Sequence, residues 1–456
     1  MKITTTPVKQ TYQIIDHLQV EVDVFNNPYH FELDKLFQMA TRINKKRSFL
    51  FVSKVLGKHL AVSPQIPLLV GNLLAMRYME VVHGYKDQRS EAIAKAIQTN
   101  EQLVDLVDEI ERNPIPLVSP ATFIGFAETA TALGHAVFSS FQTGGTYIHT
   151  TRENIEELSS IINFEEEHSH ATSHRVYASD SDLLNNNQEV VLVDDEITTG
   201  KTAINIIRTI KEHYPVKKIF TVVSILDWRI EENRQKYKQL EKELNITINA
   251  VSLIDGCITI VGEPILEDEK DETVPEIEQH VTFLYTDDLV DPSAFQYASS
   301  INEDSTRNAS PYLKATGRFA ITLEDNNLFM HTHKKVAEYV KQHRKGIKSL
   351  VLGTGEFMYL PMKIASYMGE GIYYHSTTRS PIYQTTQESY TIQNKFSFNC
   401  PENPGVMNYL YNIHPYQYDE VFIFIERITS EEGIKSLLHD LKRTFIPNIT
   451  VVIMTK

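Results

Sequence analysis

Residues 190–202 read VVLVDDEITTGKT, and this stretch decides how the first half of the chain is organised. Its first four residues are apolar and mostly β-branched, which is typical of a buried parallel strand. Its last three letters also end the nucleotide-binding P-loop. That motif needs another glycine five positions before its last glycine, but Asp195 occupies this position. The P-loop interpretation is therefore excluded.

Two carboxylates and a turn rich in hydroxyl groups follow the strand. Asp194 and Asp195 come at its carboxyl end, where open α/β sheets bind ligands. The turn consists of Thr198, Thr199, Gly200, Lys201 and Thr202. Apolar residues then recur at helical spacing, so the turn lies at a helix N-terminus, where free N–H groups and the helix dipole favour a single phosphate. This arrangement suits a phosphorylated ribose better than a triphosphate.

The stretch resembles the phosphoribosyl pyrophosphate (PRPP) motif of type I phosphoribosyltransferases. The resemblance implies that Asp194 and Asp195 engage the ribose 2′- and 3′-hydroxyls with Mg²⁺ nearby, which makes them the predicted metal ligands. It also implies that residues 198–202 hold the 5′-phosphate. A strand–helix turn with a capping threonine and a solvated acidic pair is the structural alternative.

The composition is that of an ordinary globular protein, with 42% hydrophobic and 23% charged residues. A formal net charge of −15 argues against general nucleic-acid binding. Cys257 and Cys400 are too few for a disulfide framework or a thiolate zinc site. The start MKITTTPVKQ lacks the apolar core of a signal peptide, and the longest apolar stretch, IPLLVGNLLAM, is too short to span a bilayer. We therefore expect a cytoplasmic protein that binds neither nucleic acid nor membrane.

The hydrophobic pattern predicts two α/β domains with parallel-rich sheets, and the resemblance implies that both are Rossmann-like and of the phosphoribosyltransferase type. The first covers residues 1–266 and includes a mostly helical insert at about 64–112. Residues 267–280 are acidic and poor in apolar side chains, so we expect a linker there. The second domain covers residues 281–456.

The second domain echoes the first in sequence order. The paired landmarks are Gly125 and Gly353, Arg152 and Arg379, Thr198 and Thr429, and Thr221 and Thr450. Ile425 and Glu426 replace the two aspartates of the motif, and Glu431 and Glu432 would repel a 5′-phosphate. We therefore expect a degenerate repeat that has lost PRPP binding.

TTRSP, at residues 377–381, resembles the signature of the TRSP domain. This domain follows a phosphoribosyltransferase-like domain in bacterial proteins from tellurite-resistance and stress gene clusters. FLFVSKVLGKHLAV, GFAETATALGH, GRFAITL and LGTGEFMYLP are also similar to that family, so the resemblance covers most of the chain. It implies a glycosyltransferase of nucleotide metabolism, working either as a homodimer or with partner proteins of the same gene cluster. It does not name the acceptor.

The resemblance to type I phosphoribosyltransferases implies two further segments that hold the leaving pyrophosphate. In GFAETATALGH, the predicted pyrophosphate loop is Ala127, Glu128, Thr129 and Ala130, because small residues let backbone N–H groups approach an anion. Glu128 fits only if its carboxylate points away or binds Mg²⁺, and a plain strand–helix turn is the alternative. Arg152, in IHTTRENI, is the predicted cation for the leaving group. Its alternative is a solvated surface arginine.

Two clusters of basic and histidine side chains have several interpretations. The segment EEEHSHATSHR is expected to be a mobile loop over the site rather than a metal site. Its histidines are His168, His170 and His174. The cluster of Lys54, Lys58 and His59 could steer PRPP, contact the acceptor or be a solvated surface.

These observations predict a Mg²⁺-dependent enzyme that moves ribose 5-phosphate from PRPP to a nitrogenous, nucleobase-like small-molecule acceptor. Asp194, Asp195 and Arg152 are the predicted catalytic residues. The alternatives are a non-catalytic PRPP- or nucleotide-binding regulator or scaffold in a stress-response system, and a nucleotide-releasing phosphorylase. Acceptor specificity is expected in a hood built from residues 1–65 and 222–265, where Trp228 either stacks on a base or belongs to the core.

Overall fold

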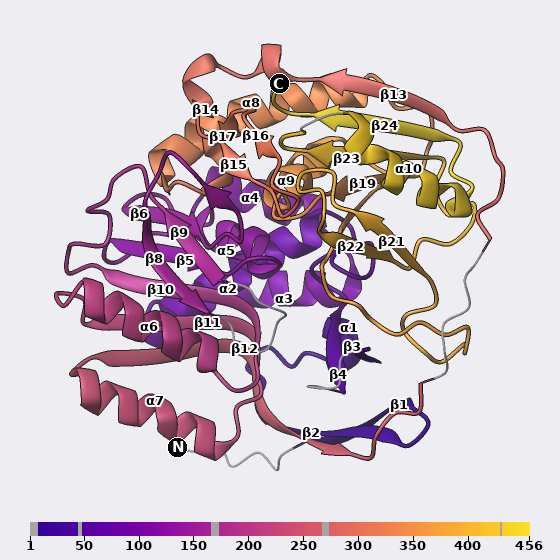
Figure 1. Cartoon of the computed structure of the whole chain (residues 1–456). Coiled ribbons are helices and arrows are strands. Elements are labelled where there is room, and N and C mark those ends of the chain that lie inside the picture. The colour runs from indigo at the N-terminus through magenta and orange to yellow at the C-terminus, as the bar shows by residue number, and fades with distance from the viewer. Residues whose placement is uncertain (1–7, 44–47, 166–172, 267–272, 429–430) are drawn as a thin grey trace.

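Five parallel strands form the centre of the first sheet and carry the opening motif (Figure 1). In spatial order they are β12 (Thr247–Val261), β11 (Ile219–Asp227), β10 (Glu189–Ile197), β5 (Ala121–Gly125) and β6 (Gly145–His149). Residues 190–193 are completely buried, as expected for a parallel strand with both faces covered. One expectation was wrong: the strand continues through the acidic residues to Ile197, because Asp194 and Glu196 still pair with β11.

Antiparallel strands complete both edges, so the sheet is mixed. The antiparallel hairpin of β1 (Val8–Ile15) and β2 (Leu18–Asn26) joins β12 at one edge. At the other edge, β18 (Ile321–Thr322) pairs with β6. β18 belongs to the second half of the chain, so the second half contributes directly to the first sheet.

Helices cover both faces of the first sheet. α2 (Gln65–His83) and α5 (Ala130–Phe138) lie on one face, and their apolar side chains share a core cluster with Val191 and Val193. α6 (Lys201–His213) and α7 (Glu231–Leu244) lie on the other, in a cluster with Val190 and Leu192. Alternate residues of β10 therefore point into opposite layers. α1 (Leu33–Leu36), α3 (Ser90–Thr99) and α4 (Leu103–Arg112) complete the helices of this half.

The second sheet is entirely parallel. Its order is β13 (His280–Tyr285), β24 (Asn448–Ile453), β23 (Glu420–Ile425), β19 (Ser349–Gly353) and β20 (Ile372–Ser376). Its helices are α8 (Leu323–Lys341), α9 (Tyr359–Tyr367) and α10 (Lys435–Leu441). The order β24-β23-β19-β20 matches the order β11-β10-β5-β6 in the first sheet.

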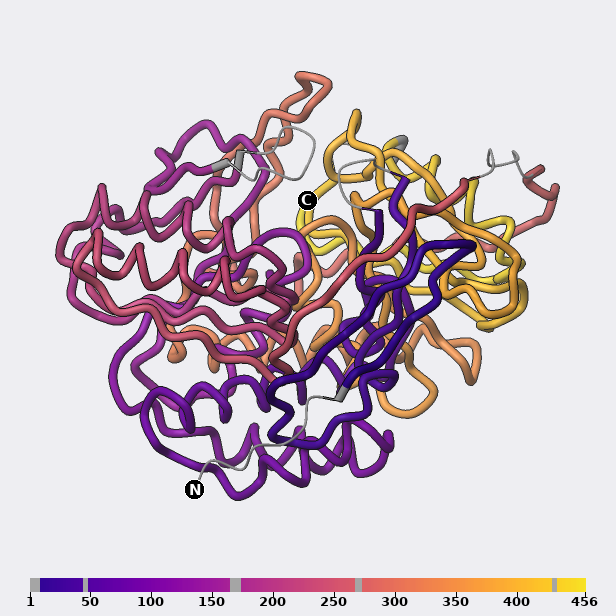
Figure 2. The backbone as a smooth tube through the Cα atoms, turned by 90° about the horizontal axis from the view of Figure 1, so that it is seen from below, coloured from indigo at the N-terminus to yellow at the C-terminus, as the bar shows by residue number. Residues whose placement is uncertain are grey.

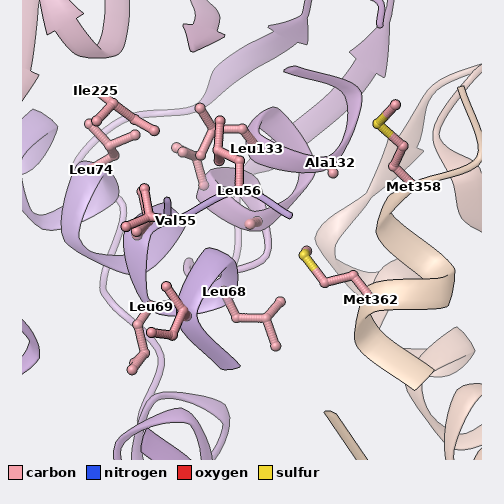
Figure 3. Packing of buried hydrophobic residues seen from close by; sticks show 14 of the residues in the cluster. Val55, Leu56, Leu68, Leu69, Leu74, Ala132, Leu133, Ile225, Met358 and Met362 are labelled. Atoms are coloured by element: carbon pink, nitrogen blue, oxygen red, sulfur yellow. The ribbon is translucent and has the colours of Figure 1, made fainter. Parts of the chain in front are cut away.

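The two sheets share one hydrophobic core. A single cluster of buried side chains includes residues of α2, α5, α9 and strands of both sheets. Met358 and Met362 approach Leu68 and Ala132 from the C-terminal half (Figure 3). The ring of His135 also stacks on Tyr359 with centroids 3.6 Å apart. Separating the halves would expose this apolar surface to water, which opposes their dissociation.

The N-terminal segment also runs along the C-terminal half (Figure 2). The hairpin of β3 (Phe37–Thr41) and β4 (Phe49–Ser53) contacts the segment after the TTRSP sequence, where the Thr41 amide donates to the Tyr390 hydroxyl at 2.8 Å. Two further hairpins are β8 (Ser160–Glu165) with β9 (Ser173–Tyr177) and β21 (Lys395–Asn399) with β22 (Met407–Tyr411).

The computed structural model describes residues 8–43, 48–165, 173–266, 273–428 and 431–456. Within these ranges, no helix combines the length and apolar character that a membrane crossing requires. Residues 267–272 of the expected linker lie outside the described part, and residues 273–279 form neither helix nor strand.

Candidate functional site

The opening motif lies in a pocket of about 430 Å³ at the carboxyl end of β10. Because β5, β6 and β10 are parallel neighbours, the segments that follow them meet at this edge of the sheet. The predicted residues that line the pocket are Asp194, Asp195, Thr198, Thr199, Gly200, Thr202, Ala127, Glu128, Thr129 and Arg152. Ala130 and Lys201 are not lining residues but the first residues of α5 and α6.

The acidic pair faces a lysine from the predicted basic cluster. The Lys58 ammonium lies 3.8 Å from Oδ2 of Asp195, and Oδ1 of Asp194 accepts from the Asp195 amide at 2.9 Å. His59 also borders the pocket but is buried, whereas Lys54 is not a lining residue. Lys58 thus connects the site to the N-terminal segment. Two carboxylates on one strand end supply the hard oxygen ligands that Mg²⁺ prefers when it also binds phosphate.

The hydroxyl-rich turn depends on Gly200. Its φ is 74°, a left-handed conformation at the N-cap of α6. A Cβ added there would lie 2.8 Å from the ring of Tyr237, a residue of α7. The Arg229 guanidinium lies 4.0 Å from the centre of the same ring and is held by two hydrogen bonds to Asp227, at 2.9 and 2.7 Å.

The sequence did not reveal that buried side chains of Tyr237, Arg229 and Asp227 pack beside the turn at Gly200. The pair Asp227 and Arg229 is visible in the letters DWR at the end of β11, but an acid and a base two positions apart are common on surfaces. Only the packing of α7 brings Tyr237 against both Arg229 and Gly200 of the hydroxyl-rich turn.

The predicted pyrophosphate loop is shaped by the segment after β6 and by the second half of the chain. The Ala127 amide donates to Oγ1 of Thr150 at 2.8 Å, and the Ala127–Glu128 peptide bond is cis. Oε2 of Glu128 accepts from the Arg379 amide at 3.2 Å. The carboxylate that seemed misplaced in an anion-binding loop therefore engages the C-terminal half.

Arg152 lines the same pocket as the motif and lies on a segment held by a second carboxylate, that of Glu356. Its amide donates to Oε1 of Glu356 at 2.8 Å, and Oγ1 of Thr151 donates to Oε2 of the same residue at 2.6 Å. Arg318 contacts Oε2 of Glu356 at 2.6 Å. Burial opposes ionisation of Glu356, but the Arg318 charge, His149 and the hydrogen bonds from Thr151 and the Arg152 amide together lower the pKa of the carboxyl below its usual range.

The predicted histidine loop was partly wrong. His168 and His170 lie outside the described residues, but His174 is a buried residue of β9. Its Nδ1 lies 3.0 Å from Oγ1 of Thr150, and its ring stacks on Phe164. The pairing of β8 with β9 fixes this end of the segment in place. In the described part of the chain, no group of three or more His, Cys, Asp or Glu side chains is placed to hold a metal ion.

A less polar wall completes the pocket. Phe49 and Phe51 of β4, Ile258 and Ile260 of β12, and Ser380 of the TTRSP segment line it. Trp228 is not a lining residue: it is 1% exposed and stacks on Phe51 with ring centroids 5.7 Å apart. The interpretation of Trp228 as a base-stacking residue is therefore wrong, and it belongs to the core.

The described residues at the corresponding end of the second sheet leave little space. A cavity of only about 20 Å³ lies there, bordered by Arg379, Cys400, Glu402, Glu426 and Arg427. Oε1 of Glu402 accepts from the Glu426 amide at 2.8 Å. Burial and the neighbouring Glu426 charge raise the pKa of Glu402 to about 8.

Gly200→Ala should disrupt the phosphate turn. The new methyl group meets the Tyr237 ring and the backbone keeps a positive φ, so we expect the free energy of unfolding to fall by about 1–3 kcal/mol. Affinity for ribose 5-phosphate, measured by calorimetry, should fall at least tenfold. Gly84→Ala is the control, since its φ is 69° but nothing lies within 4 Å of the added Cβ. Equal ribose 5-phosphate affinity in the two variants would contradict this role of Gly200.

Glu402→Gln should make the protein more stable than the wild type at neutral and alkaline pH. Between pH 4.5 and 8, folded Glu402 keeps a proton that the unfolded chain releases, so wild-type stability falls as pH rises. Glutamine carries no titrating proton, so the variant does not lose stability in this way. The difference in free energy of unfolding between the variant and the wild type should grow by about 1.4 kcal/mol per pH unit in this window. Urea unfolding from pH 5 to 8 measures the difference, with Glu388→Gln at an exposed position as control. A difference independent of pH would refute the assignment.

Comparisons with known proteins agree with the geometry of the first half. Residues 36–257 match the model of a phosphoribosyl transferase family, and residues 315–441 match the TRSP domain found C-terminal to it. A search of curated proteins found no match.

Solved adenine phosphoribosyltransferases are similar in structure at low sequence identity. The Rhodothermus marinus enzyme is 12% identical and the match covers 49% of this chain and 96% of that chain, with a TM-score of 0.28. The Trypanosoma brucei enzyme is 13% identical, with coverages of 56% and 91% and a TM-score of 0.29. The Saccharomyces cerevisiae enzyme is 9% identical, with coverages of 49% and 98% and a TM-score of 0.29.

The two family models follow each other along the chain and together cover more than half of it. The chain therefore belongs to the family in which a phosphoribosyl transferase domain is followed by a C-terminal TRSP domain.

Proposed function

We propose that this phosphoribosyltransferase moves ribose 5-phosphate from PRPP to a nitrogenous acceptor in a Mg²⁺-dependent reaction that releases pyrophosphate. One observation carries the proposal: a single pocket gathers an acidic pair, a hydroxyl-rich turn at a helix N-terminus and an arginine, and these three parts match the three parts of PRPP. The acidic pair suits the ribose hydroxyls, the turn suits the 5′-phosphate, and Arg152 suits the pyrophosphate.

Each group has a distinct role in the transfer. Asp194 and Asp195 hold the ribose, which orients C1′ toward the acceptor. The turn at Gly200 holds the 5′-phosphate through backbone N–H groups and hydroxyls, so this end of the substrate stays fixed while the C1′–O bond breaks. Arg152 and the loop at Ala127 face the opposite end, where negative charge develops on the leaving group.

The acidic pair also fits Mg²⁺. Asp194 and Asp195 would hold the ion together with oxygens of the substrate, in keeping with the preference of Mg²⁺ for one or two carboxylates plus phosphates. When bound, the ion neutralises part of the charge of the departing pyrophosphate. The Lys58 ammonium beside Asp195 adds a second positive charge from the chain itself.

The apolar wall is the proposed acceptor side of the pocket. Phe51 offers aromatic surface to a planar, nucleobase-like ring, and Ser380 offers a hydroxyl from the C-terminal half. This placement would locate acceptor selection at the junction of the two halves.

We also propose that the second domain is a degenerate copy of the first. The matching strand order supports this, as does a shared hydrogen bond: Ala127 N to Thr150 Oγ1 at 2.8 Å corresponds to Gly355 N to Thr377 Oγ1 at 3.0 Å. The small cavity beside Glu426 supports a loss of PRPP binding. Thr429, the second copy's counterpart of the phosphate turn, lies outside the described residues.

The double substitution Asp194→Asn with Asp195→Asn should abolish Mg²⁺-dependent binding of PRPP. Each charged hydrogen bond contributes about 1.5–3 kcal/mol, so we expect the Kd to rise at least roughly 100-fold. Calorimetric titration with PRPP, with and without Mg²⁺, measures this without knowledge of the acceptor. Asp287→Asn with Asp288→Asn is the control, because it makes the same charge change outside the pocket.

Three outcomes separate the candidate functions. Mg²⁺-dependent binding that is lost in the double variant supports the proposed site. A wild-type protein that binds PRPP but releases no pyrophosphate with any nucleobase supports a regulator or scaffold. Equal PRPP binding by the wild type and the double variant would refute the assignment of the acidic pair.

A further inference from the structure

Two glutamates form hydrogen bonds between the domains, and each accepts from a backbone amide of the other domain. Glu128 lies in the loop before α5 and accepts a hydrogen bond from the Arg379 amide. Glu356 lies in the loop before α9 and accepts one from the Arg152 amide. Each loop follows the corresponding strand of its own sheet, β5 or β19, so each domain holds the arginine segment of the other.

We infer that Glu356 is a positioning residue for phosphoribosyl transfer, and that the C-terminal domain completes the active site by holding the Thr151–Arg152 segment. The inference rests on the proposed function, since it assigns Arg152 to the pyrophosphate half of the substrate. Glu356 does not line the pocket, so it acts through Arg152 rather than by contact with substrate.

Both oxygens of Glu356 are occupied. Oε1 accepts from the Arg152 amide at 2.8 Å, and Oε2 accepts from Thr151 Oγ1 and from Arg318 Nη1, both at 2.6 Å. The side chain of Glu356 is 5% exposed, and that of Arg318 is 2% exposed. A carboxylate this buried and fully bonded has one arrangement, and breaking it would leave the Arg318 charge less well compensated.

These hydrogen bonds fix the position of the Arg152 backbone. Its amide is tied to Glu356, and its carbonyl accepts from Arg175 Nη1 at 3.3 Å. The neighbouring Thr151 pairs with Arg175 through both backbone groups, at 2.8 and 2.9 Å. The backbone on both sides of the Arg152 Cα is therefore held, which limits the region that its side chain can reach. A loss of the Glu356 contact would release one of these restraints.

The two halves of the substrate site depend on Glu356 unequally. The acidic pair and the phosphate turn lie on β10 and α6, which belong wholly to the first domain. Among the described residues that line the pocket, Arg152 is the one whose backbone amide donates to the Glu356 carboxylate, and its neighbour Thr151 donates to the same carboxylate. A change at Glu356 should therefore weaken binding of pyrophosphate and leave binding of ribose 5-phosphate unchanged.

The test is calorimetric titration of Glu356→Gln with two probes in the presence of Mg²⁺, namely pyrophosphate and ribose 5-phosphate. We expect affinity for pyrophosphate to fall at least tenfold and affinity for ribose 5-phosphate to change less than twofold. Glu426→Gln is the matched control: it removes another carboxylate from Arg318, 3.3 Å away, but touches neither Thr151 nor Arg152. We expect it to lower the Tm to a similar degree while both affinities stay at the wild-type level.

A double-mutant cycle separates positioning from general support. In the Arg152→Ala background, Glu356→Gln should cause no further loss of pyrophosphate affinity. Glu356→Asp keeps the charge beside Arg318 but moves the carboxylate away from Arg152. This variant replaces Glu356→Gln in the titrations if Glu356→Gln does not fold. It should show the same selective loss of pyrophosphate.

Several results would overturn the inference. They are wild-type pyrophosphate affinity in both Glu356 variants, an equal loss for both probes, an equal loss in Glu426→Gln, and a further loss in the Arg152→Ala background. A folded wild-type protein that binds neither probe would instead refute the proposed function, and the inference with it.

Discussion

The structure depends on the neutralisation of one buried guanidinium. Arg318 is 2% exposed and lies between carboxylates of three chain segments, with Glu153 at 3.0 Å, Glu356 at 2.6 Å and Glu426 at 3.3 Å. An arginine cannot lose its charge in a protein, so burial requires that these partners stay in place. Glu153 follows β6, Glu356 follows β19 and Glu426 follows β23. The Arg318 charge therefore holds together segments at the carboxyl ends of strands in both sheets.

This constraint explains how two similar sheet ends can differ so strongly. At the first, the carboxylates of Asp194 and Asp195 border a pocket of about 430 Å³, with a lysine beside them. At the second, the carboxylate of Glu426 is used internally by Arg318 and by the Leu313 amide. The same chemical group thus faces an open pocket in one half of the chain and an arginine at the junction in the other.

The fold was largely predictable, because its signals are local. The apolar run before Asp194, the turn at Gly200 and the helix behind it are encoded in neighbouring residues, and β10 and α6 lie where expected, although β10 continues to Ile197. Where distant packing decides, the sequence left the position of Trp228 open and predicted a wrong one for His174. Trp228 belongs to the core because β4 lies over it, and His174 is fixed in a strand because β8 pairs with it.

The sequence by itself determined the chemistry of the candidate site: an acidic pair, a hydroxyl-rich turn and an arginine, each recognisable from its own neighbours. The tertiary structure alone decided which side chains contact the turn and the arginine segment. Glu356 meets the Arg152 amide across 204 residues, and Tyr237 reaches Gly200 from another helix. Strand and helix periodicity reflects contacts between residues close in sequence, whereas these contacts exist only after helices and whole sheets have docked. The role of the second domain therefore became visible only in the folded chain.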